Sequence, residues 1–196
     1  MKKKKSFLSV KEMVEIALLV AIAVILDLDG FKITLSATGG SIGFTMVPLF
    51  IIGYRHGFIK SLIGVGLIYG ITTCLLDGHG FIYYPFDYFV AYGCSLAVAS
   101  LFAKFISRKV DGKLTYLVNN GLMAFGVLLA GIVRVIGHTI SSMVFYEYTL
   151  GAALAYNIPY VVPSILLCLV VLFMLYPTLI VLNRMYPTSF LKKINA

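Results

Sequence analysis

The sequence has few charged residues and no tryptophan. Only 12% of its 196 residues are charged, against about 25% in an average soluble domain, and 60% are hydrophobic. This composition argues against a water-soluble fold and predicts an integral membrane protein. The three cysteines lie in apolar stretches without CxxC or CxxxH spacing, so we expect packing positions and no metal site at Cys74, Cys94 and Cys168.

A phosphate-binding loop of the form G-x-x-x-x-G-K-[ST] is also absent. The chain is therefore not expected to hydrolyse ATP by the P-loop route, and no cofactor is predicted. Energy for pumping would have to come from a partner protein or from an ion gradient.

Apolar stretches of helical length recur along the chain. A helix needs about 20 mainly apolar residues to cross a bilayer. Six stretches are candidates, of which the second is short: 11–28, 43–54, 57–77, 83–107, 117–146 and 157–183. Without an internal repeat or a linker, residues 1–196 predict a single all-α domain of six transmembrane helices.

Lysine and arginine are unevenly distributed over the connecting segments. With the N-terminus inside, 14 of the 16 cations fall on the cytoplasmic side, leaving Lys32 outside and Arg134 within the fifth stretch. Acidic residues gather on or near the outer side, at Asp27, Asp29, Asp77, Asp87 and Glu147. Both termini are therefore predicted to be cytoplasmic. The basic surface faces anionic lipid, and nucleic-acid binding is not expected.

The lysine run before the first apolar stretch resembles the start of a signal peptide. No A-x-A-like cleavage site follows it, and the stretch opens a regular pattern of six. We interpret it as an uncleaved first helix in the cell membrane.

Polar side chains form a stripe on the fifth stretch. Arg134, His138, Ser142 and Tyr146 follow one another at i+4 and share a helix face. A rise of 1.5 Å per residue puts His138 roughly 12 Å, and Arg134 about 18 Å, below the outer end of this helix. Arg134, the deeper residue, is interpreted as structural, neutralising a helix end or a carboxylate.

Two other stretches place polar groups at a similar depth. Asp87 and Tyr88 open the fourth stretch, and Asn157 follows Tyr156 at the start of the sixth. Taken singly, each could be a satisfied interhelical group or part of the interfacial aromatic belt. Taken together, a carboxylate, an imidazole and an amide among aromatic rings predict a pocket for an organic cation.

Small residues mark two more features. Gly39, Gly40 and Ser41 lie in the first outer loop, which is either a lid over the pocket or an ordinary flexible loop. Ala17 and Ala21 form a small-xxx-small step on the first stretch. That step suits both internal packing and contact with an external partner.

These residues resemble the thiamine-binding S components of energy-coupling factor (ECF) vitamin transporters over most of the chain. The resemblance comprises a Gly-Gly-Ser-Ile loop, an Arg-x-Gly turn, a Gly-rich helix, an acidic-Tyr pair, a basic residue followed by His at i+4, and a Tyr-Asn pair. The matching segments are 39–42, 55–57, 66–70, 87–88, 134–138 and 156–157.

The resemblance implies a subunit of the bacterial plasma membrane that captures thiamine from outside. It would deliver thiamine with a transmembrane coupling protein and two ATPases. Asp87 and Asn157 would hold polar or cationic parts of the ligand, and Tyr88, His138 and Tyr146 would contact its rings. Ala17 and Ala21 resemble the docking motif for the coupling protein. The chain departs from the family in having no Trp to sandwich the ligand, and Tyr146 stands in one such place.

Other functions fit the sequence less well. The first alternative is an S component of the same fold for another small vitamin or precursor, such as a pyridoxine-like or pyrimidine compound. The second is an ion-coupled exporter or channel, and the third an intramembrane enzyme with Asp87 and His138 as acid and base. The expected lack of a second carboxylate at pocket depth argues against both the exporter or channel and the enzyme. We therefore expect a binding protein and not an enzyme.

Overall fold

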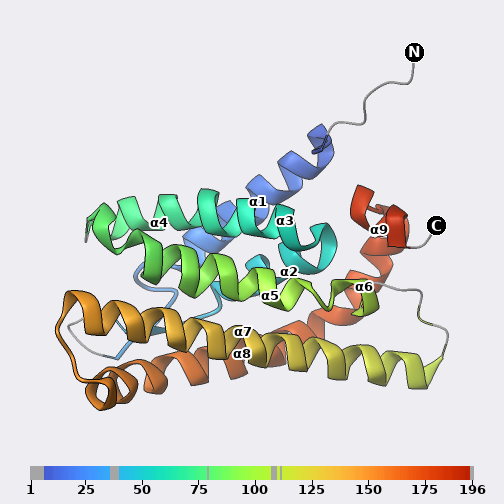
Figure 1. Ribbon diagram of the computed structural model, residues 1–196. Helices are drawn as coiled ribbons and strands as arrows, with labels where there is room; N and C mark the ends of the chain where they lie inside the picture. Colours follow the sequence, from blue (N-terminus) through green and yellow to red (C-terminus); the bar gives the residue numbers. More distant parts are fainter. Residues whose placement is uncertain (1–6, 36–39, 79, 107–109, 111, 195–196) are drawn as a thin grey trace.

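The computed structural model of the protein describes residues 7–35, 40–78, 80–106, 110 and 112–194, and it is a helical bundle (Figure 1). Helices occur in all six predicted stretches. In chain order, the elements are α1 (Val10–Leu26), β1 (Ile33–Thr34), β2 (Ser41–Ile42), α2 (Met46–His56), α3 (Phe58–Ser61), η1 (Leu62–Tyr69), α4 (Gly70–Asp77), η2 (Phe81–Tyr83), η3 (Tyr84–Cys94), α5 (Ser95–Ser100), α6 (Ala103–Ile106), α7 (Lys113–Phe145), α8 (Leu150–Met185) and α9 (Ser189–Ile194).

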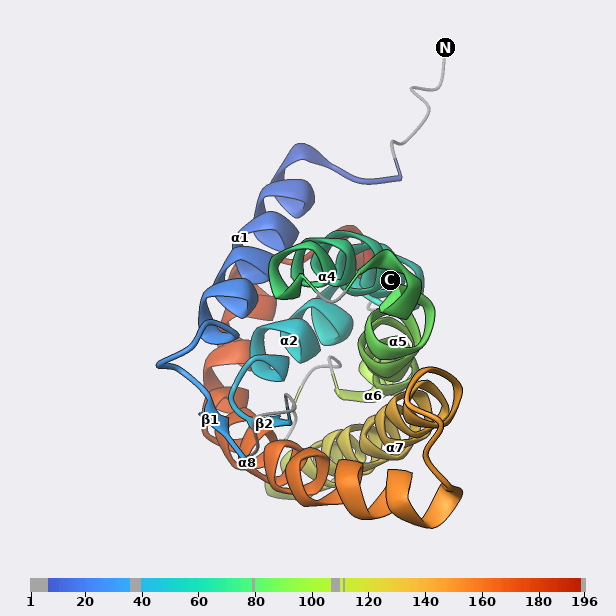
Figure 2. The ribbon, with the colours of Figure 1, turned by 90° about the vertical axis from the view of Figure 1, so that its left-hand side faces the viewer.

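The short helix α2 lies in the middle of the bundle, surrounded by the other helices (Figure 2). Ten of its eleven residues are buried, and the largest apolar ones belong to the core. A helix that is apolar on all sides is stable only when other helices enclose it. This explains why the second predicted stretch is short yet strongly apolar.

Within the part of the chain that the structure describes, three helical segments are long and apolar enough to cross a membrane: Phe58–Asp77, Lys113–Phe145 and Leu150–Met185. Their outward faces carry large apolar side chains, among them Phe125, Ile132 and Leu166. Such a surface would be unfavourable in water and is suited to lipid. The helical fold and these three segments together indicate a membrane protein.

A small β-hairpin corrects the expectation of a purely helical fold. Strands β1 and β2 pair antiparallel, with Ile33 opposite Ile42 and Thr34 opposite Ser41. The hairpin packs on α8, where the Ser164 hydroxyl donates to the Ser41 carbonyl. A side chain on Gly40 would come within 2.6 Å of the Tyr160 ring. The predicted loop is thus anchored at Gly40 and Ser41, while Gly39 lies outside the described residues.

Elements η1 and η3 are wound as π-helices and cross each other at two glycines. A β-carbon on Gly93 would lie 2.5 Å from the Gly66 α-carbon, so this crossing requires glycine. π-helical winding is rare and often marks functional sites. Here it leaves the Gly66 carbonyl to accept a 2.8 Å hydrogen bond from the Tyr84 hydroxyl.

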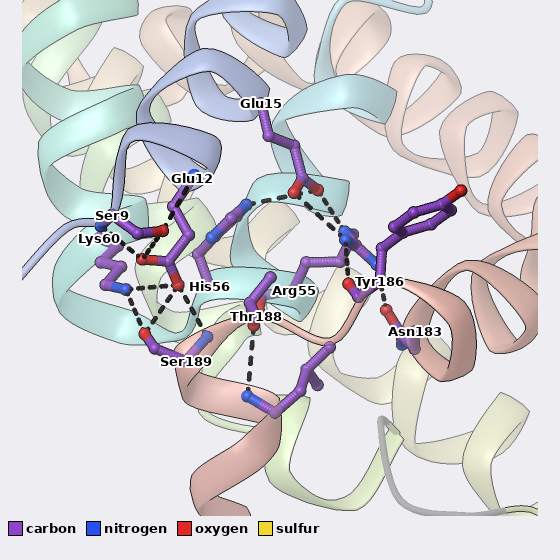
Figure 3. A network of polar contacts seen from close by, with 11 residues as sticks. Ser9, Glu12, Glu15, Arg55, His56, Lys60, Asn183, Tyr186, Thr188 and Ser189 are labelled. Carbon is purple, nitrogen blue, oxygen red and sulfur yellow. Dashed lines mark hydrogen bonds and ion pairs between the residues drawn. The ribbon is translucent and has the colours of Figure 1, made fainter.

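A network of charged side chains ties the start of α1 to α2, α3 and α9 (Figure 3). We call the connected side chains the terminal network: Ser9, Glu12, Glu15, Arg55, His56, Lys60, Asn183, Tyr186, Thr188 and Ser189. Glu12 accepts from the Ser189 hydroxyl at 2.7 Å and pairs with Lys60 at 2.9 Å. Glu15 pairs with Arg55, whose guanidinium also donates to the Asn183 side chain and the Tyr186 carbonyl.

Candidate functional site

A cavity of about 290 Å³ opens at the end of the bundle opposite the terminal network. It lies where α1 and α4 end, where η3 begins and where α7 turns into α8, at the left of Figure 1. Its lining is polar and aromatic, and comprises Asp27, Asp29, Lys32, Thr34, Ser41, Asp77, Asp87, Tyr88, Tyr92, Arg134, His138, Ser142, Tyr146, Tyr148, Tyr156, Asn157 and Tyr160.

All five residues predicted for the ligand site line this one cavity: Asp87, Tyr88, His138, Tyr146 and Asn157. They come from η3, from α7 and the residue that ends it, and from α8, so the fold brings together groups up to 70 positions apart in the sequence. The stripe predicted on the fifth stretch also faces the cavity along its whole length, including Arg134 and Ser142.

Asp87 is held by two side chains of α7. His138 Nδ1 lies 2.9 Å from Asp87 Oδ1, and the Ser141 hydroxyl donates to Oδ2 at 2.6 Å. The Asp87 side chain is 23% exposed, so part of the carboxylate still faces the cavity. Hydrogen bonds to both oxygens fix the orientation of the Asp87 carboxylate.

Asn157 is almost fully buried and its amide is engaged by the protein. Its nitrogen donates to the Ser142 hydroxyl at 3.0 Å and to the Ala153 carbonyl at 2.9 Å. Its oxygen accepts from the Tyr160 hydroxyl. Both donors are therefore used, and the amide offers a ligand chiefly its second oxygen lone pair.

An aromatic wall runs along the cavity from α7 to α8. Neighbouring ring centroids lie 5.8 to 6.1 Å apart along the series Tyr146, Tyr148, Tyr156, Tyr160, His138 and Tyr92. These rings meet edge to face or at a tilt, so the wall presents both ring faces and ring edges. Such a surface provides stacking partners for a planar cation without tryptophan.

Three further aspartates line the cavity besides Asp87, and this corrects the expectation that no second carboxylate lies at pocket depth. Asp27 follows α1, accepts from the Tyr69 hydroxyl at 3.1 Å and lies 3.6 Å from Lys32. Asp77 ends α4 and accepts from the Tyr88 hydroxyl at 2.8 Å. Asp29 completes the set. The sequence could have identified these aspartates as site residues, because all of them belong to the acidic residues on the predicted outer side.

The formal charge of the lining is negative. Four aspartates against the two cations Lys32 and Arg134 leave the lining with a formal net charge of −2. In a partly enclosed space a charge of this sign attracts cations and repels anions. Among the residues that the structure describes, no group of three or more His, Cys, Asp or Glu side chains is arranged to hold a metal ion. The arrangement is suited to an organic cation.

Arg134 was predicted to be structural, neutralising a helix end or a carboxylate, and the structure corrects the carboxylate part of this prediction. Its guanidinium lines the cavity and donates to the Tyr92 hydroxyl at 2.7 Å and to His138 Nε2 at 3.3 Å. The third partner is the Met46 sulfur. Within the described ranges, none of the ion pairs joins a carboxylate to Arg134.

Tyr92 and Tyr160 were not predicted as site residues. Tyr92 follows Asp87 by five positions, a spacing that meets on one face in a π-helix but not in an α-helix. Tyr160 follows Tyr156 by four positions and Asn157 by three, so helical spacing could have identified it.

Ala17 and Ala21 lie on the exposed face of α1, away from the cavity lining. The buried face of this helix carries Ile16, Val20 and Ala23 instead. Of the two readings of the small-xxx-small step, internal packing therefore does not apply, and the alanines are free to meet lipid or another protein.

Comparisons with known proteins give one family. The chain is 32% identical over 180 residues to the thiamine transporter ThiT of Bacillus subtilis strain 168, covering 85% of this chain and 90% of that protein. Its fold is similar to a solved structure of ThiT from Listeria monocytogenes, with a TM-score of 0.66, 19% identity and coverage of 87% of this chain and 97% of the other. Residues 13–184 match the sequence pattern of the thiamine transporter protein family, Thia_YuaJ. With its membrane-type helices and this similarity, the chain belongs to the Thia_YuaJ family of thiamine transporters.

Proposed function

We propose that this chain captures thiamine at the outer side of a bacterial plasma membrane, as the S component of an ECF importer. The observation that carries the proposal is the cavity with four aspartates beside a continuous aromatic wall. Thiamine joins a cationic thiazolium to an aminopyrimidine, so it needs both a counter-charge and ring surfaces. Membership of a family of transporters makes the chain a transport protein and not an enzyme.

Each predicted site residue has a role in this proposal. Asp87 supplies the negative charge for the thiazolium, since His138 and Ser141 already orient its carboxylate. His138 and Tyr146 offer ring faces, and Tyr88 closes the side of the cavity toward Asp77. Asn157 contributes one lone pair and fixes Tyr160. Cation–π contacts contribute about 0.5–2 kcal/mol per ring.

The transport arrangement is part of the same proposal. Residues 1–196 form one substrate-binding domain with six membrane-spanning helices and both termini in the cytoplasm. The uneven distribution of lysine and arginine supports this orientation. The contact between the start of α1 and α9 supports it as well, because these two segments meet at the end of the bundle opposite the cavity.

Energy comes from a coupling protein and two ATPases in this proposal. Exposed Ala17 and Ala21 on α1 provide the surface on which the coupling protein docks, because small side chains allow a close approach of another helix. Ligand capture and docking then occupy separate surfaces, which makes them separable by mutation.

Titration calorimetry on the purified chain in detergent tests the proposal. Thiamine, pyridoxine, riboflavin and biotin are compared side by side, and calorimetry suits a protein that lacks tryptophan. We expect one-to-one binding of thiamine alone. Binding of another vitamin would keep the fold and replace the substrate. Absence of binding by all four would contradict ligand capture and favour an ion-coupled transporter.

A further inference from the structure

The guanidinium of Arg134 is a buried cation, and no carboxylate among the described residues forms an ion pair with it. The residue is 5% exposed, and it lies over the Tyr92 ring at 4.4 Å from the centroid. Its Nε–H points at His138 Nε2, 3.3 Å away on the next turn of α7. A buried charge with neutral partners is costly, so this arrangement calls for a role beyond packing.

The Arg134 contact determines where the proton of His138 sits. Arginine has only donors and does not lose its proton in proteins, so His138 Nε2 must be the unprotonated acceptor. The imidazole proton is then on Nδ1, from which it donates to Asp87 Oδ1 at 2.9 Å. The chain of hydrogen bonds runs from Arg134 through His138 to Asp87, and it is complete only with a neutral imidazole.

A neutral His138 matters for what the cavity can hold. Both ring nitrogens are engaged, so the ring has its faces left for a ligand. Like charges repel strongly in a partly buried site, where solvent screens them less than in bulk water. An imidazolium at this position would repel a cationic ring stacked on it, and it would also neutralise the charge of Asp87.

We propose that Arg134 is a positioning residue that fixes His138 as the neutral Nδ1–H tautomer and thereby keeps Asp87 available as the counter-charge of a cationic ligand. The part of this inference that concerns the ligand rests on the proposed function. The tautomer itself is a property of the empty protein and does not depend on which vitamin binds.

Nitrogen-15 NMR of the histidine side chains reads the tautomer directly. The chain has only three histidines, His56, His79 and His138, so a His138→Gln variant assigns the signal by its loss. At neutral pH and without ligand, we expect one protonated nitrogen at Nδ1 and an unprotonated Nε2. A wild-type His138 that carries its proton on Nε2, or on both nitrogens, would overturn the proposal without any further variant.

An Arg134→Met variant tests the cause. We expect the single tautomer to be replaced by a mixture and thiamine affinity to fall at least about tenfold, as for loss of a charged hydrogen bond. Reduced affinity with an unchanged tautomer would reduce Arg134 to a packing residue and overturn the proposal. If the wild type binds another vitamin, the proposed substrate is wrong while the tautomer result stands.

Discussion

The charge of Asp87 can be removed without changing its shape. An Asp87→Asn side chain can still accept a hydrogen bond from His138 Nδ1, but it no longer offers an anion to a cationic ligand. We expect thiamine affinity in calorimetry to fall about 10- to 100-fold, which corresponds to a charged hydrogen bond of about 1.5–3 kcal/mol.

Glu147→Gln is the matched control for this prediction. Glu147 is exposed, follows Tyr146 directly and does not belong to the cavity lining, so the variant loses one charge near the site without changing the site itself. The thiamine affinity of the Glu147→Gln variant should equal that of the wild type. Equal affinities in the Asp87→Asn and Glu147→Gln variants would remove Asp87 from the ligand site.

Helical spacing explains which cavity residues could be read from the sequence. Arg134, His138, Ser142 and Tyr146 follow the α-helical period, so their common face was predictable. Tyr92 was not, because it meets the cavity through the winding of η3, and no pattern in the sequence identifies a π-helix. The hydrogen-bond partners of each group could not be predicted from the sequence either. The bond from Ser141 to Asp87, for example, depends on how α7 and η3 pack.

At the scale of elements, the crossing of η1 and η3 depends on two glycines. In a Gly93→Ala variant the new methyl group would meet the Gly66 backbone at 2.5 Å, and a backbone cannot move aside as a side chain can. Overpacking of this kind costs about 1–3 kcal/mol. We expect a lower thermal unfolding temperature in detergent, together with weaker thiamine binding because η3 carries Asp87.

Gly121→Ala is the control for the glycine crossing. Gly121 is exposed on α7, and a β-carbon there would meet nothing within 4 Å. Alanine is favoured over glycine in a helix by about 1 kcal/mol, so this variant should be as stable as the wild type or more so. Equal unfolding temperatures for the two alanine variants would show that the crossing can relax.

Because Ala17 and Ala21 lie on the outward face of α1, we expect a change there to affect transport without affecting thiamine binding. An Ala17→Trp variant places a large ring where we propose that the coupling protein docks, far from the cavity. Calorimetry should give wild-type thiamine affinity, while uptake by cells that contain the complete transporter should fall to background. Ile22→Trp, on a neighbouring exposed face of α1, should leave uptake intact. Normal uptake in the Ala17→Trp variant would exclude this docking surface.

Most helices could be predicted from the sequence, and the hairpin could not. Apolar stretches locate the helices because length and composition carry the signal. Strands β1 and β2 have only two residues each, too few for an alternating pattern to appear. The boundaries also shifted: the sixth helix begins at Leu150 and not at residue 157, because Thr149 caps it by accepting from the Ala152 backbone.

On the scale of the whole molecule, the terminal network connects the start of α1 with α2, α3 and α9, a contact that no pattern in the sequence predicts. In a Glu15→Gln variant the buried Arg55 loses its anionic partner. Removing one partner of a buried ion pair costs about 3 kcal/mol, so the unfolding temperature should drop. Thiamine affinity of the folded protein should stay unchanged, because the network lies at the opposite end from the cavity.

Lys11→Gln serves as the control for the terminal network. Lys11 is exposed one turn before Glu15 on α1, and substitutions at such surface positions usually change stability by less than about 0.5 kcal/mol. A Glu15→Gln variant as stable as Lys11→Gln would show that the Arg55 pair contributes nothing to the stability of the protein.

The bond between Glu12 and Ser189 joins residues 177 positions apart, and this has a consequence for biosynthesis. At a synthesis rate of about 5–20 residues per second, α1 waits roughly 10 to 35 seconds for its last partner to leave the ribosome. During that time Ser9 and Lys60 are the partners of Glu12 that are already made. The helix that enters the membrane first is therefore among the last to be fixed in place, and a nascent chain that stops before Ser189 leaves Glu12 Oε1 without the two hydrogen bonds that Ser189 donates.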